Sequence, residues 1–420
     1  ATLAKAVKLA QAGSGRVYAC AEMFEGALVV EDAVEVYGGL ACDKGWAHGE
    51  EKTTLTAGPE EVPLRIRGST TVARLEDFVI VAKDATTPGG SSITAIVEDA
   101  SVELTRCELV AGFGAEGAKG ETPSEPVGPS DPNDPSIKGA AGAAACMGPG
   151  SGNQGGVGAI NALCNTSIGG SGGTGFESAG GNGADGLPLP DPNPTNKGLG
   201  GAGDTGSGCE PGAQGANGAV GMGGVGAADL GTIDANGYAG PSGGDGLPGA
   251  LAQGGGGGGG AKGKVGCNGA SGGGGGAGGC AGGGGTGGKA GGSSIAIVSL
   301  DADLLFKDVV LTTAAGGKGG DGGDGQAGGV GGDGGGGGLG DMSAPATFQA
   351  CNGGKGGQGG FGGKGGGGRG GHSLGIAFQG KTPVTDGATI TTGARGQGGL
   401  GADEAGNGQN GVQADTQEFP

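Results

Sequence analysis

The chain has 420 residues and a formal net charge of −19, and 120 of the residues are glycine. The acidic balance disfavours a nucleic-acid partner, because it repels phosphate backbones, and no apolar run is long enough to cross a membrane. Aromatic residues make up only 3% of the chain, so any apolar core has to be confined to a few segments.

The N-terminal residues indicate a short helix followed by strands. Leu3, Ala6, Val7 and Ala10 share one helical face, and Gly13 is of the residue type that ends helices. Short strands are expected next, over residues 16–21, 27–30 and 34–37. A helix that covers the first open strand edge is one way in which a β-solenoid hides its end.

Three later segments repeat one another. Ser91–Ala111 (SSITAIVEDASVELTRCELVA) aligns without a gap with Ser293–Thr313 (SSIAIVSLDADLLFKDVVLTT), and Ser373–Thr392 continues the series. An earlier stretch, Leu75–Ala82 (LEDFVIVA), matches the LFKDVVLT part of the second segment. Recurring β-branched runs of this kind predict strands that stack coil upon coil.

Glycine-rich stretches are inserted between these repeats, so the chain is expected to leave the coils and return to lay the next one. The expected organisation is an N-terminal cap and solenoid coils at 1–111, a glycine-rich insertion at 112–292, a returning coil at 293–313, a second insertion at 314–371, a final coil at 372–392 and a glycine-rich tail at 393–420. The two parts would form one intertwined unit.

Within the insertions glycine follows a period of three. Between Ala315 and Leu339 a residue other than glycine stands at almost every third position, in one phase, and nearly all the rest is glycine. This period fits neither an α-helix nor a strand, but it fits a polyproline-II-type helix without internal hydrogen bonds. Bare glycine edges let such helices pair their backbone N–H and C=O groups. Collagen is the alternative, which the short, interrupted and proline-poor triplets disfavour.

Nine cysteines are scattered along the chain without a CxxC pair, which disfavours a zinc site. They are Cys20, Cys42, Cys107, Cys146, Cys164, Cys209, Cys267, Cys280 and Cys351. Disulfides are the expected use, with Cys20–Cys42 as the first pair, and the odd number leaves one thiol free or bonded to another molecule. Together with the start at Ala1, this predicts an extracellular or cell-surface protein, secreted and already freed of its signal peptide.

Charged side chains in the second insertion form two candidate rows. They are Asp321, Asp324 and Asp333 in one run, and Lys355, Lys364 and Arg369 in the next. These rows either face each other, within one molecule or between neighbours, or remain a solvated edge of little energetic value.

Catalysis, cofactors and metals are not expected. His48 lies in a polar turn and His372 begins a repeat, without the nucleophile elbow of a Ser-His-Asp enzyme. Gly319–Ala327 lacks the apolar position of calcium-binding nonapeptide repeats. The glycine run at 254–260 lacks the Lys-Ser/Thr that closes a phosphate-binding loop.

The N-terminal helix, RVYAC at 16–20, VEVYGGLAC at 34–42 and the Ser-Ser-Ile repeats resemble the pectin-lyase-like right-handed parallel β-helix family. The resemblance implies a right-handed β-solenoid with a capping helix, and no catalytic motif of that family is present. The glycine spacing resembles the polyglycine-II bundles of glycine-rich antifreeze proteins and of phage tail-fibre tip adhesins.

The leading functional expectation is a secreted, non-enzymatic structural protein that assembles with copies of itself into a filament or surface layer. Open solenoid ends and glycine edges are natural templates for the next copy. The alternative is a monomeric surface adhesin, or an ice- or glycan-binding module, with surface glycans as partner. Rows that mix Lys, Asp, Val and Leu disfavour ice, and a polysaccharide lyase is the least favoured class.

Overall fold

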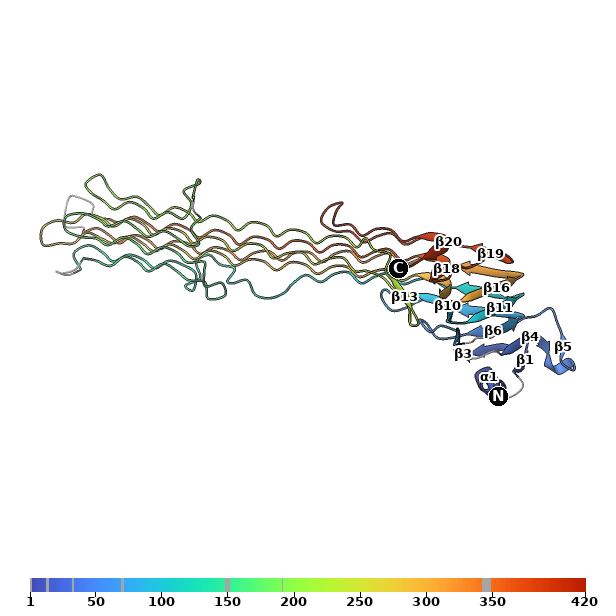
Figure 1. Ribbon diagram of the computed structural model, residues 1–420. Coiled ribbons are helices and arrows are strands. Elements are labelled where there is room, and N and C mark those ends of the chain that lie inside the picture. The colour runs from blue at the N-terminus through green and yellow to red at the C-terminus, as the bar shows by residue number, and fades with distance from the viewer. Residues whose placement is uncertain are drawn as a thin grey trace.

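The computed structural model describes residues 2–12, 15–31, 34–68, 72–147, 152–190, 192–341 and 349–420. Figure 1 shows a stack of short strands and a long arm of extended, glycine-rich segments that projects from it. Among the described residues the only helices are α1 (Leu3–Gln11) and a single 3-10 turn, η1 (Cys42–Lys44). The protein is therefore all-β, and no helix in these described ranges is long and apolar enough to cross a membrane.

Three six-stranded sheets form the stack. Sheet A contains β1 (Arg16–Cys20), β4 (Glu35–Ala41), β8 (Ala73–Glu76), β11 (Ser101–Thr105) and β16 (Asp303–Lys307), with β5 (Ala47–His48) beside β4. Sheet B contains β2 (Met23–Glu25), β6 (Thr53–Thr56), β9 (Phe78–Ala82), β12 (Glu108–Ala111), β17 (Val309–Thr313) and β19 (Ala388–Thr391). Sheet C contains β3 (Leu28–Glu31), β7 (Leu64–Arg67), β10 (Ser92–Glu98), β15 (Ser294–Leu300), β18 (Ser373–Gln379) and β20 (Gln413–Glu418).

The chain visits the three sheets in a constant order, A then B then C, for most of its length. Neighbouring strands within each sheet are parallel, apart from the short β5. The repeats therefore lie on top of one another: Ser92 pairs with Ser294, and Ser294 pairs with Ser373. This is the gap-free register that the sequence repeats predict.

In several rounds two corners contain a residue in the left-handed backbone region, with φ between 47° and 85°. The corner that follows a sheet C strand contains Gly68, Asp99, Asp301 or Gly380, and the corner from sheet A to sheet B contains Asp77, Arg106 or Asp308. Glycine enters this region without a Cβ clash, and aspartate tolerates it better than most residues. The turn geometry explains why Asp-Ala recurs at 99–100 and 301–302.

An apolar core lies between the three sheets and takes residues from each, such as Leu75 of sheet A, Ile80 of sheet B and Ile66 of sheet C. The helix α1 closes one end of this core with Leu3, Val7 and Ala10, as its periodicity predicts. Sheet C is buried on its outer face as well. A hairpin of β13 (Thr232–Asp234) and β14 (Gly237–Ala239), from the first insertion, packs there.

Serine hydroxyls lie at the third corner, between sheets B and C, where the arm begins. Ser92 Oγ accepts a hydrogen bond from Gly112 N at 2.8 Å, and Ser294 Oγ accepts one from Ala314 N at 3.0 Å. Ser373 Oγ donates to the carbonyl oxygen of Ala314 at 2.9 Å. These hydroxyls pair backbone groups at the corner where the strands give way to the arm, which gives the Ser-Ser-Ile repeat a structural reason.

Three details differ from expectation or were missed. Leu75–Ala82 stacks on 306–313, one residue away from the LFKDVVLT match, because Leu75 and Phe306 both pair with Leu104. The tail at 393–420 is not only glycine-rich, since its last part forms β20. The β13–β14 hairpin carries no repeat that predicts it. Gly13, expected to end the helix, lies outside the described residues.

Cys107 is the odd cysteine, and it is fully buried in the core between the sheets. Its Sγ lies 3.5 Å from the carbonyl oxygen of Leu75 and 3.3 Å from that of Thr105. Burial raises the pKa of the thiol to about 11, so little thiolate exists at neutral pH. Cys107 is therefore a core residue, and it cannot link one folded copy to another.

We expect the native protein to resist alkylation at Cys107. With N-ethylmaleimide at pH 8, mass spectrometry should find no adduct on the folded chain and one adduct after unfolding in guanidinium without reductant. The second reaction is the control that the thiol is intact. Rapid labelling of the folded chain would contradict the buried position.

Candidate functional site

The arm starts and ends at the same corner of the stack. The chain leaves sheet B after β12 and after β17, and it returns to sheet C at β15 and at β18. The strand pairs continue into the arm: Gly117 N donates to Lys318 O at 2.8 Å beyond β12 and β17, and Gly288 N donates to Gly366 O at 2.9 Å before β15 and β18. Along these segments the hydrogen bonds recur at every third residue. The stacked strands therefore set the register of the arm.

Inside the arm one glycine run is hydrogen-bonded to six other segments. Gly255, Gly256 and Gly257 each donate one backbone hydrogen bond to one segment and accept one from another. The acceptors are Gly276, Ala213 and Ala184, at 2.8–2.9 Å, and the donors are Gly170, Gly354 and Gly201, at 2.7–2.8 Å. Because the backbone directions repeat after three residues, each phase of the run serves its own pair of neighbours.

Glycine is required in this lattice because a carbonyl oxygen of a neighbour occupies the place of each Cβ. A Cβ on Gly255 would lie well inside contact distance of Gly354 O, and one on Gly276 would clash in the same way with Gly332 O. Gly336 is different, because nothing lies within 4 Å of its Cβ position. Between residues 318 and 339 the residues other than glycine are half-buried or exposed, so they mark the phase that faces outward there. Elsewhere in the arm small side chains such as Ala270 and Ala277 are buried inside the lattice.

Alanine substitution should separate these two kinds of glycine. Gly276→Ala should destabilise the arm by about 2 kcal/mol or more, because the lattice has to open to admit the methyl group. Gly336→Ala is the matched control and should be neutral or stabilising by about 0.5 kcal/mol, through the unfolded state. Hydrogen exchange of the arm amides, with all disulfides oxidised, measures both. Equal effects of the two variants would contradict the lattice.

The charged rows meet within one molecule. Lys355 lies 3.2 Å from Asp333, Lys364 lies 4.0 Å from Asp324, and Lys318 lies 2.8 Å from Asp321. The hydrogen bond from Lys318, together with that from Leu400 N, lowers the pKa of the Asp321 carboxyl. These partly exposed pairs contribute little to stability.

Arg369 does not belong to the charged rows. It is buried at the base of the arm, where its guanidinium donates to Ala228 O and lies 3.4 Å from Gln409 Oε1. Burial lowers its pKa, against the attraction of Asp229. Its phase slip in the sequence marks this inward position.

Three disulfides fasten the arm and a fourth fastens the stack. They are Cys146–Cys267, Cys164–Cys280 and Cys209–Cys351 in the arm, and Cys20–Cys42, the first expected pair, in the stack. Each bridge in the arm joins segments more than a hundred residues apart in sequence. Such crosslinks oppose the conformational entropy of the glycine-rich chain.

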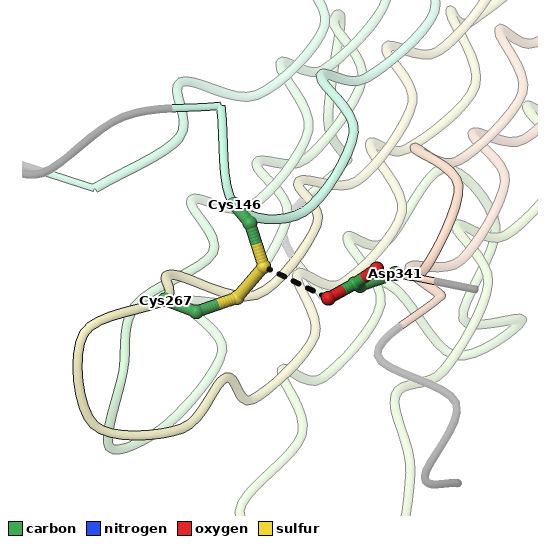
Figure 2. Close-up of side chains that lie close together, drawn as sticks. All are labelled: Cys146, Cys267 and Asp341. Atoms are coloured by element: carbon green, nitrogen blue, oxygen red, sulfur yellow. Dashed lines mark hydrogen bonds between the residues drawn. A yellow bond between two sulfur atoms is a disulfide. The ribbon is translucent and has the colours of Figure 1, made fainter. Parts of the chain in front are cut away.

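One of these bridges lies beside a carboxylate. Figure 2 shows Asp341 directed at the Cys146–Cys267 disulfide, with Oδ2 3.7 Å from Cys146 Sγ. Within the described residues this is the only group of three side chains with metal-ligand atoms close together. Disulfide sulfurs lack the thiolate charge that binds zinc, so the group holds no metal while the bridge is intact.

His372 joins three parts of the chain at the base of the arm. Its Nε2 donates to Leu230 O at 2.9 Å and its Nδ1 accepts from Val412 N at 2.8 Å. The fully buried ring packs edge-on against Tyr238 and Phe419, with centroids 5.0 and 5.7 Å away. Burial, reinforced by Arg369, lowers the pKa of His372 to about 4 from its usual 6.5. His372 is therefore a neutral, structural residue.

Stability should fall on acidification because of His372. Between pH 6.5 and pH 4 the unfolded chain binds a proton on this ring that the folded chain does not, so folding loses roughly 2–3 kcal/mol across that window. His372→Gln should lower stability at pH 7 but show a shallower decline towards pH 4. Thermal unfolding of both proteins at several pH values measures the difference. Parallel pH profiles would exclude this role.

His48 belongs to a second cluster, on the strand stack. Its Nε2 lies 2.8 Å from Asp77 Oδ2, and Arg106 binds both carboxylate oxygens of Asp77, at 2.9 and 2.8 Å. Burial opposes the charge on Asp77, but Arg106 and His48 outweigh it and lower the pKa of the carboxyl. Asp77 and Arg106 are corner residues, so this ion-pair cluster follows from the stacked turns.

No family model matches the chain, and neither a curated protein nor a solved structure is significantly similar to it.

Proposed function

We propose that this protein is a secreted, non-enzymatic structural protein that self-assembles into an extracellular filament or surface layer. In this proposal the stack is a right-handed β-solenoid of the pectin-lyase-like kind, and the arm is a polyglycine-II bundle. Four disulfides support an oxidising, extracellular setting. The observation that carries the proposal is an exposed apolar surface along the otherwise hydrogen-bonded arm.

This surface, the apolar stripe, consists of Met222, Val225 and Leu247, which are 70%, 71% and 50% exposed. Met222 and Val225 are three residues apart, so they lie on the same edge of their segment. Leu247 belongs to the adjacent segment, since its N donates to Met222 O at 2.9 Å and Gly244 N donates to Val225 O at 2.8 Å. Contiguous exposed apolar side chains mark interaction sites.

Because the backbone of the arm is hydrogen-bonded within the molecule, we expect copies of the protein to associate through side chains. The inner glycines have their backbone partners within the molecule, so the glycine edges are not the template for another copy. The last strand of sheet C, β20, has the sequence QADTQE, whose charged and polar residues protect a sheet edge from pairing. The apolar stripe is therefore the favoured contact between copies, through lateral packing of arms.

Charge placed in the apolar stripe should abolish assembly. Electron microscopy of the purified protein should show filaments or sheets, and the double variant Met222→Lys/Val225→Lys should remain as discrete particles. Gln214→Lys, an exposed position on the same segment outside the stripe, is the matched control and should still assemble. Discrete monomers of the unaltered protein at high concentration would refute the proposal.

A further inference from the structure

A groove is lined by residues of α1, β1 and β4 and by Trp46. Figure 1 shows α1, β1 and β4 at the end of the strand stack that lies away from the arm. The groove has a volume of about 780 Å³, within the range of small-ligand sites. Its apolar floor comes from α1 and the sheet, and its aromatic wall from Tyr18 and Trp46. These two side chains are 55% and 53% exposed. Large rings are rare in this chain, so two exposed in one groove need a reason.

Trp46 is exposed to solvent on a backbone conformation that is unfavourable for a bulky residue. Trp46 has φ +62°, in the left-handed region that bulky residues avoid. The surrounding loop holds it there: Cys20–Cys42 fastens the start of the loop, Trp46 N donates to Ala41 O at 3.1 Å, and β5 pairs with β4 directly afterwards. Strained residues kept by their surroundings cluster at functional sites.

The second ring is fixed as well. Tyr18 stacks on Tyr37 of the neighbouring strand, with centroids 5.5 Å apart and planes 20° apart. Tyr37 Oη donates to Glu35 Oε2 at 3.0 Å, and Arg16 Nε donates to the same oxygen at 2.7 Å. The groove thus combines two preorganised ring faces with a rim of hydrogen-bonding groups whose charges compensate each other.

We propose that this groove binds a neutral oligosaccharide, with sugar rings stacked on Trp46 and Tyr18. The negative face of an aromatic ring attracts the polarised C–H groups of a pyranose, and the apolar floor accepts the same face of the sugar. Arg16, Glu35 and the tyrosine hydroxyls offer donors and acceptors to the sugar hydroxyls. A neutral ligand fits because Glu35 balances Arg16 and because a net charge of −19 repels acidic glycans.

The single tryptophan of the chain makes the site directly observable. Trp46 emission is titrated with the hexamers of cellulose, xylan and chitin, and with hexagalacturonate as the acidic comparator. At least one neutral hexamer should change the emission saturably, and the acidic hexamer should bind more weakly. No saturable change with any neutral hexamer, or preferential binding of hexagalacturonate, would overturn the proposal.

Variants test whether the rings carry the binding. Tyr18→Ala should raise the dissociation constant about tenfold, and the emission of Trp46 still measures binding in this variant. Tyr18→Phe should bind like the unaltered protein, because the ring face remains. Trp46→Ala, followed by calorimetry, should abolish measurable binding. Phe361→Ala removes an exposed ring on the arm and should change nothing. If Tyr18→Ala binds with unaltered affinity, the emission change does not come from stacking in this groove, and the proposal is contradicted.

These measurements are independent of assembly. They are made in the Met222→Lys/Val225→Lys background, whose substitutions lie on the arm, so the outcome does not depend on whether the unaltered protein forms filaments. If the oligosaccharide binds but the unaltered protein does not assemble, the groove proposal stands and the proposed function is rejected. If the unaltered protein assembles but no oligosaccharide binds, the proposed function stands and the groove proposal is rejected.

Discussion

The whole arm depends on one interaction, the backbone hydrogen bond between neighbouring extended segments at every third residue. An extended segment with a threefold repeat has no hydrogen bonds of its own, so each N–H and C=O has to be paired laterally or left to water. At Gly255–Gly257 the pairing reaches six neighbours. Only glycine permits this approach, because the partner's oxygen stands where a Cβ would be. The high glycine content and the close approach of the segments therefore follow from the same steric constraint.

Glycine-rich chains lose much conformational entropy on ordering, and the structure meets this cost with long-range restraints. The stacked strands hold both ends of each insertion at one corner, and they set the spacing between the two insertions to that of neighbouring strands in a sheet. Serine hydroxyls pair the backbone where the repeat changes from two to three residues. The disulfides then join distant segments of the arm. The stack acts as the template, and the arm extends its register.

The outward faces of the molecule have separate roles in this account. The arm presents an apolar stripe on a rigid surface, and the stack presents an aromatic groove at its helix-capped end. The charged rows are internal ion pairs and therefore offer few free charges to a partner. A structural protein with lateral contacts on its arm and a glycan contact on its stack would be suited to join an assembly to a polysaccharide surface.

The sequence alone determined the features that repeat. Period-three glycine predicted the extended segments, the Ser-Ser-Ile repeats predicted the strand register from residue 91 onwards, and Leu3, Val7 and Ala10 predicted the capping helix. Repetition makes such features readable because each copy meets the same environment.

Only the tertiary structure decided the features that occur once. Several features depend on which distant segments become neighbours: the burial of Arg369 and His372, the disulfide partners within the arm, the position of β20 and the groove lined by both Tyr18 and Trp46. A one-residue error in matching Leu75–Ala82 arose for the same reason: both registers look alike in sequence, and only pairing across the sheet distinguishes the inward from the outward face.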